Sequence, residues 1–133
     1  MAGKKLKALG LRVTPQRLGI LDIVKGDRTH PSAQKIYEKM LKKYPGVSFA
    51  TVYNTLSRLV KAGEIQELDI DPDKKRFDPY TSLHYHFYCK TCGKVYDVEH
   101  DLSLIPNIKR IDGHQIETIQ LNFKGMCRAC GQT

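Results

Sequence analysis

Residues 48–63 read SFATVYNTLSRLVKAG, and this stretch decides the fold of the first half of the chain. Ser48 suits a helix N-cap because its hydroxyl can accept a backbone N–H, and Gly63 suits a C-terminal stop. Between these two residues, apolar side chains recur at the spacing of one helix face. The apolar positions are Val52, Leu56, Leu59 and Val60. The sequence therefore predicts an amphipathic helix whose other face is polar and basic.

Two longer helices are predicted before this one, and a short basic helix over residues 4–9 precedes them. Thr14 is placed to cap a helix over residues 15–25, which starts with a proline and carries Leu18, Leu21 and Val24 on one face. Ser32 is placed to cap the next helix, which ends at a Pro-Gly turn. Helix, tight turn and helix in a basic region form the helix-turn-helix pattern.

A β-hairpin is predicted directly after the three helices. Its strands lie within residues 64–70 and 75–78, and the turn DPDK at residues 71–74 joins them. A hairpin in this place looks like the wing of a winged helix. We therefore expect a winged helix-turn-helix domain over residues 1–79.

The second half of the chain has a different pattern. Residues 80–83 are predicted as a hinge, and residues 84–133 as a second domain. Strands are expected at 84–89 and 94–99, with a weakly helical segment over 101–111. Ile119, Leu121 and Phe123 alternate with polar residues, which predicts a further strand with one apolar face. The fold class is α+β.

The positive charge is concentrated in the first half. The net charge of the chain is +8, yet residues 1–63 alone hold 13 Lys and Arg against 3 Asp and Glu, a net of +10. A basic block of this kind is typical of a module that binds a polyanion, and a merely soluble basic surface is the alternative. No apolar run reaches the ~20 residues of a membrane span, and the N-terminus lacks a secretory pattern. We expect a cytoplasmic protein with no membrane partner.

All four cysteines occur in two CxxC pairs, Cys89-x-x-Cys92 and Cys127-x-x-Cys130. Thiols stay reduced in the cytoplasm, so paired CxxC elements there favour a metal over disulfides. Four thiolates can close a tetrahedron around Zn²⁺. The pattern predicts a structural zinc site, with a redox dithiol or buried unreactive cysteines as the alternatives.

A second kind of metal site is indicated by nitrogen and oxygen donors. His84 and His86 lie two apart, so on a strand they point to the same side, and Asp97 follows on the next predicted strand. His30 and Asp78 are the other candidate donors, although each is weak evidence by itself. Donors of this kind without sulfur suit Fe²⁺, Mn²⁺ or Zn²⁺. Surface histidines are the alternative, and His100 and His114 are read as solvated.

The polar face of the helix over residues 48–62 is the candidate DNA reader. Tyr53 suits contact with a thymine methyl or a sugar, and Asn54 suits a base edge. Arg58 and Lys61 suit guanine or phosphate, while Arg12 and Arg17 suit phosphate. A solvated helix face is the alternative.

With these residues in hand, the chain resembles the ferric uptake regulator family over nearly its whole length. The resemblance rests on short motifs spread along the chain. They are RVTPQR at 12–17, HPSAQKIY at 30–37, ATVYNTL at 50–56, RFD at 76–78, HYH at 84–86 and both CxxC pairs. It implies a homodimeric winged-helix repressor with a C-terminal α/β dimerisation domain that binds a palindromic operator in double-stranded DNA.

Within the family, the chain is most similar to the peroxide-sensing branch. That likeness implies a regulatory Fe²⁺ or Mn²⁺ held by three histidines and two aspartates, which are His30, Asp78, His84, His86 and Asp97. Iron sensors usually carry Glu at the place of Asp97. The likeness also implies iron-catalysed oxidation of His30 or His84 by peroxide, which releases DNA.

Two other functions are compatible with the same residues. One is a repressor of this family that responds to iron, manganese or zinc without peroxide chemistry. The other is a non-haem iron enzyme that uses two histidines and one carboxylate. Five protein ligands leave little room for a substrate, so no enzymatic activity is expected.

Overall fold

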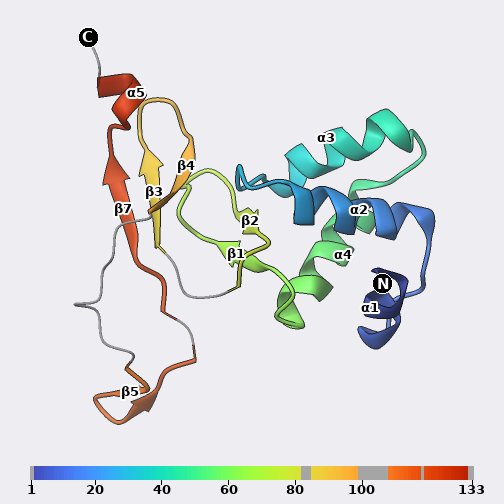
Figure 1. The fold of residues 1–133 in the computed structure, drawn as a ribbon, viewed down its shortest axis with the longest axis horizontal. Helices are drawn as coiled ribbons and strands as arrows, with labels where there is room; N and C mark the ends of the chain where they lie inside the picture. Colours follow the sequence, from blue (N-terminus) through green and yellow to red (C-terminus); the bar gives the residue numbers. More distant parts are fainter. Residues whose placement is uncertain (1, 82–84, 99–107, 118, 132–133) are drawn as a thin grey trace. The chain divides into compact units, whose positions relative to one another are not determined.

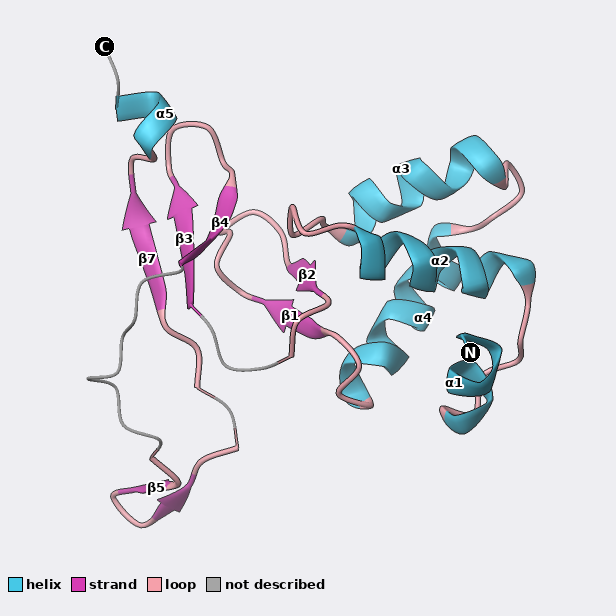
Figure 2. Ribbon diagram, viewed as in Figure 1, coloured by secondary structure: helices cyan, strands magenta, loops and turns pink. Residues whose placement is uncertain are grey.

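The computed structural model describes residues 2–81, 85–98, 108–117 and 119–131 of the chain (Figures 1 and 2). The chain forms two compact units, Met1–Thr81 and Ser82–Thr133. The division falls within the segment 80–83. The first unit holds four helices and a small hairpin, and the described part of the second unit is mainly β-structure.

The first unit contains the predicted helices in the predicted order. The elements are α1 (Ala2–Ala8), α2 (Pro15–Gly26), α3 (Ala33–Lys43), α4 (Phe49–Lys61), β1 (Gln66–Leu68) and β2 (Arg76–Asp78). The three predicted N-caps are confirmed, since the hydroxyls of Thr14, Ser32 and Ser48 each accept the backbone N–H three residues later. These bonds satisfy donors that the first turn of a helix leaves without a partner.

The apolar faces of α2, α3 and α4 form one core. Ile36 of α3 and Leu56 and Leu59 of α4 are fully buried in it. On α2 the buried residues are Ile20, Leu21 and Val24, whereas Leu18 is only half-buried. The face predicted for α2 was therefore wrong at one position. The buried stripe of α2 runs through Ile20, Leu21 and Val24, so it begins further from the start of the helix than predicted.

The hairpin that follows α4 is shorter than predicted but has the predicted place. β1 and β2 pair antiparallel, and Phe77 of β2 packs into the helical core. The backbone N–H of Phe77 donates to the carbonyl oxygen of Pro31 (2.9 Å), and Ser32 forms a β-bridge with Arg76. The wing is thus bonded to the segment that leads into α3.

The second unit is built on a three-stranded sheet in the order β4-β3-β7 (Figure 2). Its strands are β3 (Tyr85–Cys89), β4 (Val95–Val98) and β7 (Asn122–Gly125), and the other elements are β5 (Arg110–Ile111), β6 (His114–Gln115) and α5 (Arg128–Gly131). β3 pairs antiparallel with β4 and parallel with β7. α5 follows β7 directly along the chain (Figure 1).

Two predictions for this unit require correction. The strand expected around Ile119, Leu121 and Phe123 begins only at Asn122, and Phe123 is 40% exposed. The alternating pattern therefore does not mark a buried face within the described part of the unit. Period-2 alternation fixes which side chains share a face, but what covers that face depends on tertiary structure.

The helix expected over residues 101–111 is wrong at its described end. Arg110–Ile111 is a strand, β5, paired with His114–Gln115. Asp112 (φ 50°) and Gly113 (φ 83°) lie between them, and both have the left-handed backbone that a tight hairpin turn needs. The Asp-Gly dipeptide was the signal for this turn in the sequence. Residues 101–107 lie outside the described residues.

The core of the first unit yields a test of its packing. Leu56→Ala removes a fully buried side chain and leaves a cavity, so the free energy of unfolding should fall by about 2–5 kcal/mol. Urea denaturation followed by the helical signal measures this change. The control is Asn54→Ala on the exposed side of the same helix, which should change stability by less than about 0.5 kcal/mol. Equal losses in the two variants would contradict the packing described here.

Candidate metal centres

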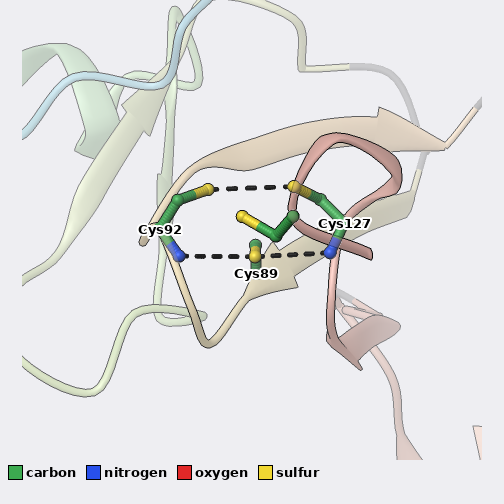
Figure 3. A group of neighbouring side chains, drawn as sticks. Cys89, Cys92 and Cys127 are labelled. Atoms are coloured by element: carbon green, nitrogen blue, oxygen red, sulfur yellow. Dashed lines mark hydrogen bonds between the residues drawn. The ribbon is translucent and has the colours of Figure 1, made fainter. Parts of the chain in front are cut away.

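The four cysteines lie together in the second unit. Figure 3 labels three of them, Cys89, Cys92 and Cys127. Cys89 ends β3, Cys92 lies in the turn before β4, Cys127 follows β7, and Cys130 is in α5. The parallel pairing of β3 with β7 aligns Cys89 with Gly125, which brings the two CxxC segments side by side. The four sulfur atoms are all within 4.8 Å of one another.

Backbone N–H groups organise this cluster. The N–H groups of Cys92 and Cys127 both donate to Sγ of Cys89, at 3.4 and 3.3 Å (Figure 3). The turn between Cys89 and Cys92 closes at Gly93, whose φ of 75° favours glycine and whose N–H donates to the carbonyl of Cys89 (2.8 Å). The two N–H donors, one from each CxxC segment, hold the sulfur atom of Cys89 in place.

One sulfur–sulfur distance in the cluster matches the edge of a tetrathiolate zinc site. Sγ of Cys92 lies 3.8 Å from Sγ of Cys127. With Zn–S bonds of ~2.3 Å, the edge of a regular tetrahedron is ~3.8 Å. The donors therefore fit a closed, four-coordinate Zn²⁺ without rearrangement of these two sulfurs.

The hydrogen bonds favour the thiolate form that a metal requires at Cys89 and Cys127, whereas a hydrogen bond with Cys127 raises the pKa of the Cys130 thiol to about 12. The N–H of Cys92 lowers the pKa of the Cys89 thiol to about 5. A hydrogen bond with Tyr96 lowers the pKa of Cys127, and the same contact raises the pKa of the Tyr96 hydroxyl to about 12. Tyr96 was missed in the sequence because no spacing rule connects β4 with a cysteine that follows β7.

A His–Asp pair lies on the sheet of the second unit. His86 of β3 and Asp97 of β4 are directly opposite each other in the antiparallel register. Nε2 of His86 lies 3.5 Å from Oδ1 of Asp97, and the imidazole is buried while the carboxylate is partly exposed. The predicted neighbourhood of these two donors is thus present. His84 lies outside the described residues.

A second His–Asp pair lies within the first unit. His30 is in the loop between α2 and α3, and Asp78 ends β2. Nε2 of His30 lies 3.4 Å from Oδ2 of Asp78, and both side chains are only 2% exposed. The other oxygen of Asp78 accepts the backbone N–H of Tyr80 (2.8 Å), which fixes the carboxylate. Two donors 48 positions apart in sequence are brought together by the wing.

Imidazole nitrogen beside carboxylate oxygen is a donor set that suits Fe²⁺, Mn²⁺ or Zn²⁺. Burial of an imidazole and a carboxylate together is unfavourable unless their polar atoms gain partners. Each unit contributes one such pair, and each pair supplies two ligands. The residues present therefore fit a divalent transition metal. Of the two histidines predicted to be solvated, His114 is exposed, and His100 is not among the described residues.

The side chains predicted to contact DNA are exposed, except that of Arg17, which is half-buried. Tyr53 is 49% exposed, and Asn54 and Lys61 are exposed on the same helix. Arg58, however, donates from Nη2 to the carbonyl of Leu9 (3.1 Å), so its guanidinium is bonded to the chain after α1. Nη1 of Arg17 similarly donates to the carbonyl of Arg12 (3.0 Å). Sequence spacing could not show these backbone contacts.

The fold and the two kinds of donor cluster define a class, that of winged-helix proteins with a structural thiolate cluster and separate His–Asp metal ligands. Residues 8–124 match the model of the ferric uptake regulator family, and the chain belongs to this family. No helix in the described part of the chain is long and apolar enough to cross a membrane.

Three relatives illustrate the similarity. The peroxide operon regulator of Bacillus subtilis is 36% identical over 129 residues, which cover 96% of this chain and 89% of that protein. The structure of the Vibrio cholerae ferric uptake regulator has a TM-score of 0.72 at 28% identity, and the match covers 96% of this chain and 100% of that chain. That structure is described as revealing a structural rearrangement of the DNA-binding domains. The structure of PerR from Streptococcus pyogenes, solved to explain peroxide sensing and gene regulation, has a TM-score of 0.54 at 30% identity. The match covers 97% of this chain and 90% of that chain.

The thiolate cluster leads to a prediction about stability. Removal of zinc by a strong chelator should unfold the second unit, because so small a unit depends on the four-sulfur cross-link. Hydrogen exchange should rise in β3, β4 and β7 while α2, α3 and α4 stay protected. Cys127→Ser should behave like the chelated protein, and Thr91→Ala, an exposed neighbour of the cysteines, should not. Persistent protection of β3 without metal would contradict this role.

Proposed function

We propose that the chain is a metal-dependent, peroxide-responsive transcriptional repressor that binds a palindromic operator in double-stranded DNA as a cytoplasmic homodimer. The observation that carries this proposal is that each unit holds one buried imidazole beside one carboxylate, His30 with Asp78 and His86 with Asp97. Family membership supports a regulator rather than an enzyme. Zn²⁺ at the four cysteines is the structural metal in this proposal.

The regulatory metal in this proposal is one Fe²⁺ or Mn²⁺ ion shared by both His–Asp pairs, with His84 as the fifth ligand. Two donors alone make a weak site, whereas five hold a transition-metal ion and leave one position of an octahedral coordination sphere open. An ion held in this way restricts the movement of one unit against the other. The rearrangement of DNA-binding domains described for the Vibrio cholerae relative supports such a movement in the family.

This restriction connects metal occupancy to DNA binding. A dimer engages two half-sites about one helical turn apart only if its recognition helices have the matching separation. The ratio of the DNA-competent arrangement to the other arrangements must change from about 1:99 to 99:1 for a full switch. Binding of the metal must then favour the DNA-competent arrangement by about 5.5 kcal/mol. In this proposal α4 reads the major groove with Tyr53, Asn54 and Lys61. Arg12 contacts phosphate, and Arg17 and Arg58 combine phosphate contacts with their bonds to the backbone.

The peroxide response uses the ligands themselves. Fe²⁺ held by these residues would activate hydrogen peroxide next to the imidazoles. One oxygen atom of the peroxide would enter the ring, the other would leave as water, and the imidazole would supply the two electrons. His30 and His84 are the residues proposed to gain oxygen, because the similarity to the peroxide-sensing branch of the family implies oxidation at these two ligands. An oxidised imidazole is a weaker nitrogen donor, so its pair releases the metal and the restraint between the units is lost. The cysteine site takes no part in this step.

The metal ligands can be tested through operator binding. Asp97→Ala and His86→Ala should each abolish metal-dependent binding to operator DNA, because each removes one donor of a shared site. Fluorescence anisotropy with and without Mn²⁺ measures the effect. His114→Ala, which changes an exposed histidine, is the matched control and should leave the metal dependence intact. Unchanged metal dependence in the Asp97 and His86 variants would remove the basis of this proposal.

The peroxide response has its own test. After hydrogen peroxide treatment, the Fe²⁺ form should gain one oxygen atom at His30 or His84, which mass spectrometry of the peptides detects, and DNA affinity should fall. The Mn²⁺ form should gain none and should stay bound to DNA. Oxygen addition in both forms, or in neither, would favour a repressor that responds to the metal alone. The peptide that contains His114 serves as the internal control.

A further inference from the structure

We propose that Arg76, held by Asp71, is a positioning residue that fixes His30 for metal binding and thereby couples the regulatory metal to the wing hairpin. The inference rests on the proposed function in that it takes His30 and Asp78 as ligands. It concerns the first unit alone and assigns a role to two residues that are not themselves ligands.

The contacts of Arg76 connect the turn of the wing with the backbone of His30. Nε and Nη2 of Arg76 both donate to Oδ2 of Asp71, at 3.1 and 2.9 Å. Nη1 donates to the carbonyl oxygen of His30 at 3.2 Å. The side chain of Asp71 is 3% exposed and that of Arg76 is 13% exposed, so the network is largely removed from water. The planar guanidinium fork can bond both partners at once.

Asp71 is suited to hold the guanidinium in one orientation. Its other oxygen accepts the backbone N–H of Asp73 at 2.9 Å, which ties the carboxylate to the turn of the hairpin. Burial alone would raise the pKa of Asp71, but the bonds from Asp73 and Arg76 outweigh this effect and hold the pKa below its ordinary value. The carboxylate is thus charged at neutral pH, and a charged acceptor makes the stronger hydrogen bond.

The backbone of His30 needs such support. Its φ of 60° lies in the left-handed region, which is unfavourable for a residue other than glycine. Two hydrogen bonds from β2 hold the segment in place. Arg76 bonds the carbonyl of His30, and the N–H of Phe77 bonds the carbonyl of Pro31 as part of the bridge between Ser32 and Arg76.

One strand therefore controls both the backbone and the ring of His30. Arg76 and Asp78 are two positions apart on β2, so they share a side of the strand, while Phe77 points into the core. Arg76 fixes the main chain of His30, and Asp78 places its carboxylate 3.4 Å from the imidazole. Displacement of β2 would move both ligands, and a metal that holds both ligands would restrain β2.

The test measures Mn²⁺ affinity in the zinc-loaded full chain. Arg76→Lys keeps the positive charge for Asp71 but replaces the fork by a single ammonium, which cannot preserve both contacts in their present geometry. Loss of a partner that orients a ligand typically weakens metal affinity about 10–100-fold, and a change of that size is expected here. Asp71→Asn should weaken Mn²⁺ binding in the same direction, because it removes the charge that holds Arg76.

A matched control lies on the same hairpin. Lys75 forms an ion pair with Glu67 at 2.7 Å, and its side chain is 60% exposed. Lys75→Gln breaks a wing ion pair that does not contact His30, so Mn²⁺ affinity should be unchanged. Urea denaturation of all variants separates positioning from general stability. Mn²⁺ affinity equal to that of the unaltered chain in folded Arg76→Lys would overturn the proposal, whatever the change in stability.

A measurement on the unaltered chain keeps the proposal testable if the variants fail to fold. Mn²⁺ should slow amide hydrogen exchange in the peptide that contains β2, including the N–H of Phe77, relative to the metal-free protein with zinc retained. No added protection in β2, with Mn²⁺ bound, would overturn the coupling. Asp78→Asn identifies failure of the proposed function itself, because undiminished Mn²⁺ binding in that variant means that Asp78 is not a ligand.

Discussion

The proposed metal-binding architecture of the chain depends on one kind of interaction, a buried imidazole next to a carboxylate. The described residues contain it twice, as His30 with Asp78 and as His86 with Asp97. Burial of these groups is unfavourable unless their nitrogen and oxygen atoms gain strong partners. A divalent metal ion is such a partner, and this explains why ionisable groups occur in places that apolar side chains would otherwise fill.

Each pair is assembled by a different structural device. In the second unit the antiparallel register places His86 opposite Asp97, so a local pairing is sufficient. In the first unit the wing must fold back to the loop before α3, and backbone bonds at Pro31 and His30 secure it there. The thiolate cluster has a third origin, the parallel pairing of β3 with β7. Correct positions of the ligands therefore depend on the whole fold of each unit.

Much of this arrangement could be predicted from the sequence, because the relevant signals are local. Thr14, Ser32 and Ser48 mark helix starts through their own hydroxyls, and the CxxC spacing identifies metal ligands without knowledge of the fold. Alternation along the predicted strands showed which side chains share a face, whereas the register that sets His86 opposite Asp97 is known only from the folded sheet. Family motifs then supplied His30 and Asp78, which would have carried little weight individually.

The remaining features depend on contacts between distant segments. No pattern in the sequence shows that Arg58 bonds the carbonyl of Leu9 or that Arg76 bonds the carbonyl of His30. The hairpin at Asp112-Gly113 is a different case, because the Asp-Gly turn signal was present in the sequence. The prediction followed the weak helical pattern over residues 101–111 instead, and this was wrong at residues 110–111. Backbone acceptors exist at every residue, so only the folded chain reveals which side chain uses which carbonyl.

The most direct measurement of the central claim is the number of Mn²⁺ ions bound per chain when zinc fills the cysteine site. One shared ion predicts a stoichiometry of one, and it predicts that Asp78→Asn and Asp97→Asn each remove that same ion. Two independent sites would instead bind two ions, and each variant would lose only its own. Equilibrium titration followed by the electron paramagnetic resonance of free Mn²⁺ distinguishes these results, and the second result would contradict the account.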